Sequence, residues 1–268
     1  MQRPLRFYGS KCRLAPAIIE LLPPHTCYCE PFGGSAAVLL QKPPSTVEVY
    51  NDADGLLVNF FRVLRASPQE LVRAIELTPY SRQELIEAAR FESDDPLELA
   101  RMLYVVSWQS WAGAAGGRRR LSWRYDRRRP GHKPVIDVWR DTGGLWAVAD
   151  RLRMVQLEHG DALTVIGRYN SPETVYYVDP PYPMETRSMG GRNGYRHELT
   201  PEDHVRLAQT LQEIDGMAIV SSYPSELYDE LYAGWRRVER RIKTESHSTA
   251  TEVLWVSPGC DAARGTMF

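Results

Sequence analysis

A short strand that ends in an aspartate and two prolines constrains the fold of this chain more than any other feature. Residues 174–178 are β-branched or aromatic, which predicts a buried strand. In Asp179-Pro180-Pro181-Tyr182, each proline favours an extended conformation in the residue before it. We therefore expect a stiff loop that presents the Asp179 carboxylate and the Pro180 carbonyl as hydrogen-bond acceptors, with the Tyr182 ring beside them. Open α/β sheets bind ligands at such loops, although an ordinary proline turn is the simpler interpretation of these residues alone.

The other apolar segments alternate between helical and extended spacing, which predicts an α/β fold with a mostly parallel sheet covered by helices on both faces. The expected strands are residues 25–29, 46–50, 154–157, 174–178, 217–220 and 253–256. The expected helices are residues 14–22, a segment from 38 onward, 56–64, much of 67–111, 145–152, 200–216 and 227–232. Because residues 56–145 are helical and basic and interrupt the alternation, we interpret them as an inserted module. The core domain then comprises residues 1–55 and 146–268.

Several helix starts have local signals. Asp54 precedes an apolar helical face and is expected to cap it. Ser81-Arg82-Gln83-Glu84 has the pattern of a capping box, and Asp95-Pro96 that of a cap followed by proline at the first helical position. Thr200-Pro201 is expected to begin another helix in the same way. These signals fix the helix boundaries better than the apolar spacing does.

Two turns near the N-terminus can approach a polar ligand. Gly9-Ser10-Lys11 precedes the expected helix at 14–22, so its N–H groups and ammonium can meet an anion. Its spacing is not that of a P-loop, and an ordinary helix start is the simpler interpretation. Residues 30–36, Glu-Pro-Phe-Gly-Gly-Ser-Ala, connect a strand to an expected helix, as in the first half of a nucleotide-binding unit. The pattern is not G-x-G-x-x-G, which disfavours a dinucleotide.

Acidic residues follow two further strands. Asn51-Asp52 closes the strand at 46–50, where a carboxylate can accept hydrogen bonds from ribose hydroxyls. His159-Gly160-Asp161 follows the strand at 154–157, so Asp161 is a second candidate for a ligand contact at a strand end. A plain loop residue or a helix cap is the alternative for Asp161. Both acids are expected at the same edge of the sheet as Asp179.

One segment of the chain is strongly basic. The whole chain has a net charge of −1, but residues 118–140 contain nine Lys or Arg and two acids. A local basic block with interleaved aromatic residues is typical of a polyanion site, because arginine binds phosphates and base edges and aromatic rings stack on bases. A solvated surface loop is the alternative. The candidate nucleic-acid contacts are Arg118, Arg119, Arg120, Trp123, Arg124, Tyr125, Arg127, Arg128, Arg129 and Lys133.

The cysteines and the apolar segments exclude other classes of site. Cys27 and Cys29 lie in an expected strand, and no second Cys or His pair at zinc-like spacing accompanies them, so we expect structural cysteines and no metal. No segment approaches the roughly 18–20 apolar residues that span a membrane, and the N-terminus lacks the apolar core of a signal peptide. A cytoplasmic protein is expected.

Together these motifs resemble the Dam-like DNA adenine methyltransferases. The family's Tyr/Trp-x-Gly-x-Lys opening is similar to residues 8–11, and its Glu-Pro-Phe-x-Gly-x-Gly turn is similar to residues 30–36. Its Asn-Asp element is similar to Asn51-Asp52, and its Asp-Pro-Pro-Tyr loop to residues 179–182. The four motifs occur in the family's order around a basic insertion. Ala36 stands where the family has its second glycine, which puts cofactor affinity in question.

The resemblance implies a Rossmann-like fold with an inserted target-recognition module, and transfer of a methyl group from S-adenosylmethionine to the amino group of a flipped-out adenine in double-stranded DNA. The implied catalytic residues are Asp179, Pro180, Pro181 and Tyr182. The implied cofactor-binding residues are Tyr8, Gly9, Ser10, Lys11, Glu30, Pro31, Phe32, Gly33, Gly34, Ser35, Asp52, Asp161 and Asp179. The enzyme is expected to act as a monomer, or as a dimer on DNA. Whether a restriction endonuclease accompanies the enzyme is left open by the sequence.

Two other functions are consistent with the same residues. A DNA-binding protein on this scaffold that no longer turns over is one, and Ala36 is its sequence support. Methylation of RNA or of a protein is the other, although a protein substrate gives the basic block no purpose.

Overall fold

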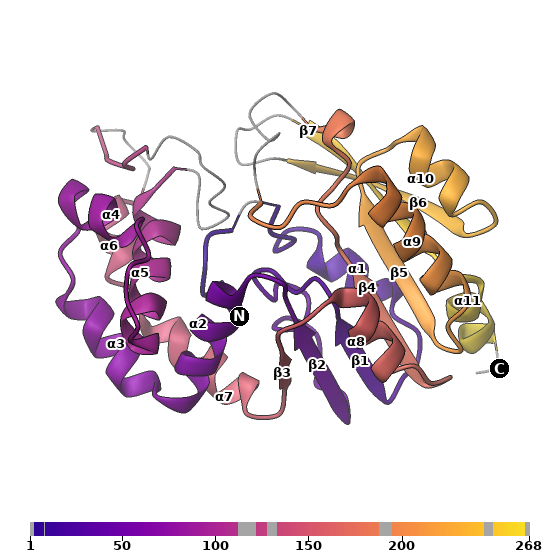
Figure 1. Ribbon diagram of the computed structural model, residues 1–268, viewed down its shortest axis with the longest axis horizontal. Helices are drawn as coiled ribbons and strands as arrows, with labels where there is room; N and C mark the ends of the chain where they lie inside the picture. The colour runs from indigo at the N-terminus through magenta and orange to yellow at the C-terminus, as the bar shows by residue number, and fades with distance from the viewer. Residues whose placement is uncertain are drawn as a thin grey trace. The chain divides into compact units, whose positions relative to one another are not determined.

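A computed structural model describes residues 3–7, 9–111, 122–127, 133–187, 195–243 and 249–265 of the chain (Figure 1). The chain forms two compact units. The helical unit comprises Met1–Ser10, Asp54–Leu157 and Asn193–Arg196. The sheet unit comprises Lys11–Ala53, Glu158–Arg192 and His197–Phe268. The expected division at residues 56 and 145 remains an interpretation.

The sheet has seven strands in the order β3-β2-β1-β4-β5-β7-β6. Its inner strands β2, β1, β4 and β5 are parallel, whereas β7 runs antiparallel to β5 and to β6. The mostly parallel α/β sheet predicted from the sequence is confirmed. The strands are β1 (Cys27–Glu30), β2 (Val47–Asn51), β3 (Gln156–Glu158), β4 (Thr174–Val178), β5 (Met217–Ser222), β6 (Arg236–Lys243) and β7 (Thr249–Val256).

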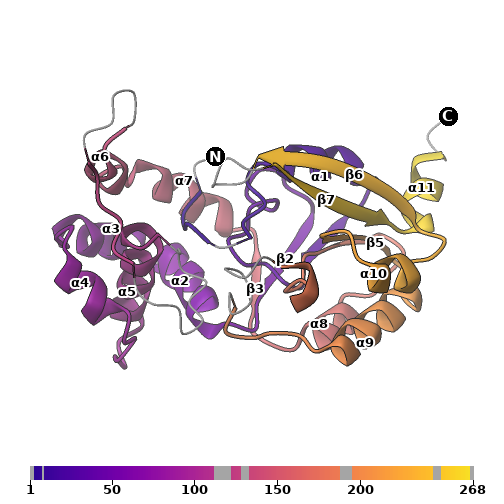
Figure 2. The ribbon, with the colours of Figure 1, turned by 90° about the horizontal axis from the view of Figure 1, so that it is seen from above.

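Helices cover both faces of this sheet (Figure 2). One face packs against α8 (Ala162–Arg168), α9 (Pro201–Gln212) and α10 (Glu226–Leu231). Its core joins apolar side chains of these helices to alternate residues of β1, β4, β5 and β7, among them Cys29, Tyr176 and Trp255. The other face carries α1 (Ala15–Leu21) and α11 (Pro258–Gly265), and a short 3-10 helix, η1 (Met184–Thr186), follows the β4 loop.

The helical unit is built around α5 (Pro96–Gln109), which contacts α2 (Gly55–Ala66), α3 (Pro68–Leu77) and α4 (Arg82–Ala88). Further along the chain, α6 (Val135–Trp139) precedes α7 (Gly143–Leu152), which packs on α2 and α3. Asp54 accepts a hydrogen bond from Leu56 N and Asp95 from Leu97 N, so both predicted caps are confirmed.

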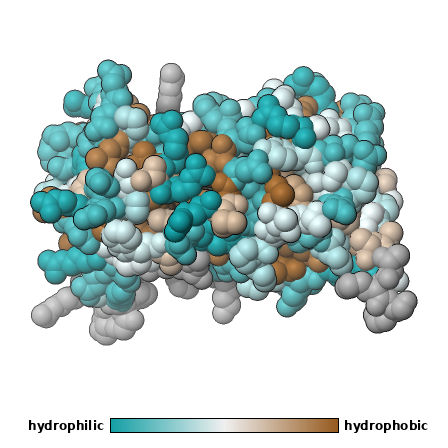
Figure 3. All heavy atoms as spheres, turned by 90° about the horizontal axis from the view of Figure 1, so that it is seen from below, coloured by the Kyte–Doolittle hydropathy of each residue, from teal (hydrophilic) through white to brown (hydrophobic). Residues whose placement is uncertain are grey.

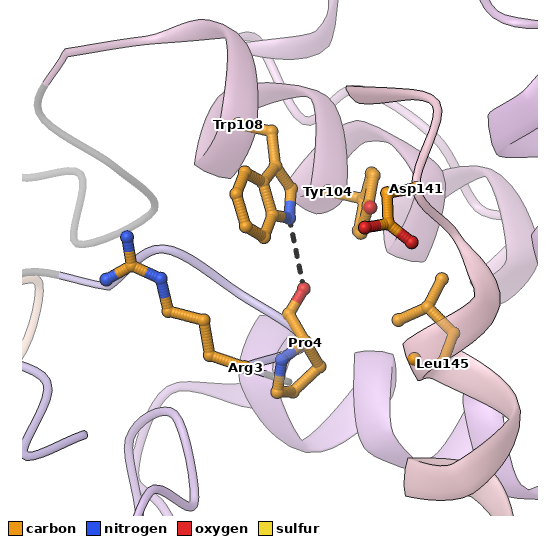
Figure 4. Close-up of a pocket in the computed structure, with 7 residues that line it drawn as sticks. Arg3, Pro4, Tyr104, Trp108, Asp141 and Leu145 are labelled. Carbon is orange, nitrogen blue, oxygen red and sulfur yellow. Dashed lines mark hydrogen bonds between the residues drawn. The ribbon is translucent and has the colours of Figure 1, made fainter. Parts of the chain in front are cut away.

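The N-terminal segment is fastened to α5 within the helical unit. The Arg6 backbone exchanges two hydrogen bonds with the Ser107 hydroxyl, at 2.6 and 3.0 Å. The Trp108 indole donates to the Pro4 carbonyl at 3.1 Å, at one side of a small pocket that Tyr104 and Asp141 also line (Figure 4). These hydrogen bonds join the N-terminal segment to a helix about a hundred residues away in the sequence.

The structure differs from the sequence predictions in several places, and helices α6, α8 and α11 are among the elements that were not expected. The helix expected from residue 38 onward is a series of turns, because Ala36 has a positive φ of 54° and Leu39 N donates to the Glu30 carboxylate instead of an upstream carbonyl. The capping box at Ser81 is half formed, since its side chain caps Glu84 N while its own N–H donates to Gln109. Strand β6 was not predicted, because its four arginines obscure the alternation of apolar and polar residues that is typical of a strand.

Surface features of the described residues are mixed. On the face drawn in Figure 3, most side chains are hydrophilic and the hydrophobic ones form small groups. Within the described residues no helix combines the length and apolar character needed to cross a membrane. In the same residues no three His, Cys, Asp or Glu side chains gather as a metal site would require, and all four cysteines are free thiols.

Candidate active site

The Asp179 carboxylate lies at the carboxyl end of β4 and is held from two sides. The Ser221 hydroxyl, near the end of the neighbouring strand β5, donates to Asp179 Oδ1 at 2.8 Å. The Lys11 ammonium, just before α1, lies 3.0 Å from the same oxygen. Lys11 is buried, so this ion pair is shielded from water on the lysine side. Both contacts fall on Oδ1, which fixes the plane of the carboxylate.

Behind Ser221, a buried phenol extends this arrangement. Tyr177 Oη lies 2.9 Å from Ser221 Oγ, and both residues are buried within the sheet. Burial, reinforced by the charge of Asp179, holds the pKa of Tyr177 well above its ordinary value. The phenol therefore stays protonated and can donate to Ser221, which in turn donates to Asp179. Sequence reasoning gave Ser221 no role, and its position at the end of an apolar strand was the available signal.

The Tyr182 ring is fixed by contacts on several sides. Its hydroxyl donates to Glu252 Oε2 at 2.5 Å. The Lys11 ammonium lies 4.7 Å from the ring centroid, and Tyr223 packs edge-to-face with centroids 4.9 Å apart. The Arg187 guanidinium donates to the Tyr182 backbone carbonyl. Burial, together with the charges of Asp179 and Glu252, raises the pKa of Tyr182 well above its ordinary value, so its hydroxyl remains a donor.

Glu252 is a buried acid in β7 that the sequence analysis missed. Burial raises the pKa of its carboxyl, and the nearby Lys11 ammonium acts in the opposite direction. The Lys11 ammonium thus pairs with the Asp179 carboxylate and also favours the ionised form of Glu252. The sequence did contain a signal for Glu252, because it is a glutamate within a mostly apolar strand. Acids are almost never fully buried without a partner, so such a position indicates a partner nearby.

The glycine turn after β1 is tied to the end of β2. Gly33 N donates to the Asn51 carbonyl at 2.7 Å, and Gly34 N donates to Asp52 Oδ2 at 2.8 Å. The Tyr50 hydroxyl donates to the Gly34 carbonyl at 2.8 Å. Gly33 packs so closely on Tyr50 that an added Cβ would lie 2.2 Å from the ring. The turn is therefore preformed, with the Asp52 carboxylate at its edge.

Asn51 connects this turn to the loop after β3. Its Nδ2 donates to the Pro31 carbonyl at 2.8 Å and to the Gly160 carbonyl at 3.1 Å, while its Oδ1 accepts from Gly160 N at 3.0 Å. In the same loop, Asp161 caps α8 by accepting from Thr164 N at 2.9 Å. The sequence analysis selected Asn51 as part of the Asn51-Asp52 motif. Its hydrogen bonds to two different loops could not be predicted, because they join residues far apart in the sequence.

Glu30 faces the protein interior rather than the open edge. Its Oε1 accepts from the Tyr28 hydroxyl and from Leu39 N, both at 2.7 Å. Burial raises the pKa of its carboxyl to about 7. Of the other candidate cofactor residues, Pro31, Gly33 and Ser35 are buried and Phe32 packs against the core. Gly9 and Ser10 belong to the helical unit, and Tyr8 lies outside the described residues.

The fold and this edge of the sheet agree with a known family. A model of the D12 class N6 adenine-specific DNA methyltransferases matches residues 7–249. The chain belongs to this family. The Type II methyltransferase M1.LlaDCHI of Lactococcus lactis subsp. cremoris is 24% identical over 280 residues, covering 95% of this chain and 94% of that protein. This D12 methyltransferase therefore uses S-adenosylmethionine as its methyl donor and DNA as its substrate.

In the helical unit, residues 122–124 of the basic block form a short antiparallel pairing with the residues at the end of α5. Trp111 N donates to the Ser122 carbonyl at 2.9 Å, and Arg124 N donates to the Gln109 carbonyl at 2.7 Å. The Trp123 ring stacks on Tyr125, with centroids 5.7 Å apart, and Arg82 lies over it at 4.8 Å. The candidate contacts outside the described residues are Arg118, Arg119, Arg120, Arg128 and Arg129.

Among the described residues in and near this block, exposed aromatic rings lie close to guanidinium groups. Tyr125 is 43% exposed, and Arg127 lies 5.9 Å from its ring centroid. Trp111, which the sequence analysis did not select, is 55% exposed with Arg124 at 5.8 Å. Lys133 is paired with Asp141 at 3.5 Å. The available signal for Trp111 was a tryptophan just after α5 and a few residues before the basic block.

Proposed function

We propose that the methyltransferase receives a flipped-out adenine at the loop of residues 179–182. The amino N–H groups of the base donate to the Asp179 carboxylate and to the Pro180 carbonyl, and the Tyr182 ring stacks on the base. The observation that carries this proposal is the fixation of Asp179 through Oδ1 by Lys11 and Ser221. Oδ2 of the same carboxylate is then the oxygen assigned to the substrate.

The Asp179 and Pro180 acceptors can make the amino nitrogen of adenine a better nucleophile. The amino nitrogen of adenine is conjugated with the ring and is a poor nucleophile. Hydrogen bonds to Asp179 and Pro180 favour a pyramidal nitrogen with an available lone pair, and they stabilise the positive charge that develops on it. Because Lys11 and Ser221 fix the carboxylate beforehand, little reorganisation is needed during the reaction. Extrusion of the base costs a few kcal/mol, which contacts with Tyr182 and the DNA backbone offset.

The donors and acceptors beside this loop fit S-adenosylmethionine. The glycine turn and the Asp52 carboxylate lie together at the ends of β1 and β2, joined by the Gly34 N–H. We assign Asp52 to the ribose, Asp161 to the adenine ring of the cofactor, and residues 31–35 to its methionine portion. Glu30 supports this turn from inside by holding Leu39 N. When bound, the cofactor supplies an electrophilic methyl group on a positively charged sulfur.

The basic block is proposed to bind duplex DNA. Arg124, Tyr125, Arg127 and Trp111 offer cations and exposed aromatic rings, which suit the backbone and unpaired bases of DNA. The enzyme is proposed to act as a monomer. The name of the Lactococcus relative further supports a modification enzyme of a restriction system.

Sequencing of methylated adenines in DNA from cells that express the protein tests this function and yields the recognition sequence. Replacement Asp179→Ala is expected to lower kcat by about a hundredfold to a thousandfold, because it removes one preorganised partner of the reacting group. Binding of S-adenosylmethionine, measured by calorimetry, is expected to persist.

The exposed Asp150→Ala, whose side chain is 81% accessible, is the matched control and should retain full activity. Full activity in Asp179→Ala would reject the catalytic assignment. Preferred methylation of RNA in competition with duplex DNA would reject the proposed substrate.

A further inference from the structure

The β6–β7 hairpin carries cations that the proposed mechanism does not use. Strand β6 is the last strand of the sheet order and pairs with β7 along its whole length. At the base of the hairpin, Arg236 is paired with Asp261 of α11 at 2.7 Å, and Arg237 with Asp229 of α10 at 3.0 Å. These two charges are neutralised within the protein. Two further arginines, Arg240 and Arg241, follow toward the tip.

The described part of β7 begins beyond the carboxyl end of the neighbouring strand β5. Strand β5 ends at Ser222, which pairs with Val253. Residues 249–252 of β7 therefore continue beyond β5, for about 13 Å at roughly 3.3 Å per residue. Glu252 in this projecting part binds the Tyr182 hydroxyl. This part of the hairpin therefore lies beside the proposed adenine site.

Arg240 and Arg241 point to opposite faces of the hairpin. Arg240 pairs directly with Glu252, and directly paired residues of antiparallel strands share a face, so Arg240 lies on the face of the proposed site. Arg241 pairs with Thr251 and shares the opposite face with Arg237, which binds α10. Within the described residues neither side chain forms an ion pair, and Arg240 Nη1 donates to the Glu239 backbone carbonyl at 3.0 Å.

We propose that Arg240 binds a backbone phosphate of the DNA strand beside the extruded adenine. A guanidinium binds phosphate with two parallel N–H bonds, and its charge is not needed elsewhere in this part of the fold. Arg241 has the same charge at the neighbouring position but faces away from the site. The inference rests on the proposed function, since it requires the adenine to lie at Asp179.

The test compares Arg240→Gln with Arg241→Gln in the full-length enzyme. The probe is an unmethylated duplex oligonucleotide that contains the site mapped in expressing cells, and its affinity is measured over a range of salt concentrations. Loss of one phosphate contact lowers the slope of log K against log salt by about 0.9. The loss of affinity between about 50 and 200 mM salt should therefore shrink about threefold in Arg240→Gln. The Arg241→Gln slope should match the wild type.

An unchanged slope in Arg240→Gln, or an equal change in both variants, would overturn the proposal. So would a lower kcat in Arg240→Gln with unchanged DNA binding, because it would assign Arg240 to the Glu252–Tyr182 pair instead. These outcomes are scored against a wild type that methylates the probe. A wild type without methylation of DNA would instead reject the proposed function itself.

Discussion

At the scale of single residues, Glu252 shows how a buried charge is kept in this enzyme. A carboxyl that is 4% exposed needs a partner, and the Tyr182 hydroxyl at 2.5 Å provides one. The same bond fixes the ring that we propose stacks on adenine. We therefore propose that Glu252 is a positioning residue, which acts on the substrate through Tyr182.

Replacement Glu252→Gln is expected to lower kcat by about fivefold. The amide oxygen still accepts from Tyr182, but the bond loses its assistance by charge, a difference of about 1 kcal/mol. Single-turnover kinetics on the mapped duplex measure the effect, and the KM for S-adenosylmethionine should stay unchanged. The exposed Glu213→Gln serves as control. Equal losses in kcat and in cofactor affinity would show a general structural defect instead.

At the scale of elements, the glycine turn and β2 form one rigid piece. Gly33 lies against the Tyr50 ring, and Gly34 and Asp52 share a hydrogen bond. If this turn holds the cofactor as proposed, its rigidity is expected to lower the cost of binding.

Replacement Gly33→Ala is expected to destabilise the fold by about 1–3 kcal/mol, because the new methyl group must displace the Tyr50 ring or the turn. Affinity for S-adenosylmethionine should fall with it. Gly167→Ala in α8 is the matched control, since nothing lies within 4 Å of its added Cβ, and alanine there should stabilise by about 0.5–1 kcal/mol. Chemical denaturation and calorimetry measure both. Wild-type stability in Gly33→Ala would contradict the packing argument.

At the scale of the whole molecule, the sequence predicted features that local chemistry decides. The Asp179 loop, the Asp54 and Asp95 caps and the parallel strands follow from neighbouring residues. The partners of the site could not be predicted, because Glu252 lies 70 positions from Tyr182 and Gly160 lies 109 positions from Asn51. Strand β6 escaped prediction because its arginines hide the alternation of Val238 and Ile242.

The stability of the whole protein should depend on pH through Glu30. The pKa of this carboxyl rises from 4.5 to about 7 in the folded state because of burial. The folded state therefore holds the proton more tightly, so the contribution of Glu30 to stability is full below pH 4.5 and is lost as pH rises through 7.

Replacement Glu30→Gln mimics the protonated carboxyl and keeps the Oε1 acceptor for Tyr28 and Leu39. The free energy of unfolding of the wild type, relative to this variant, should fall by about 3 kcal/mol between pH 5 and pH 8. Urea denaturation at the two pH values measures the difference. A difference that is independent of pH would show that Glu30 is ionised throughout.

The arginines of β6 have a consequence for solubility as well. An edge strand exposes unpaired N–H and C=O groups and can recruit a second chain by strand addition. Arg240 and Arg241, which form no ion pair within the described residues, make such pairing between two identical edges repulsive. We therefore expect the hairpin whose Arg240 we propose binds DNA also to resist self-association of the enzyme into extended sheets.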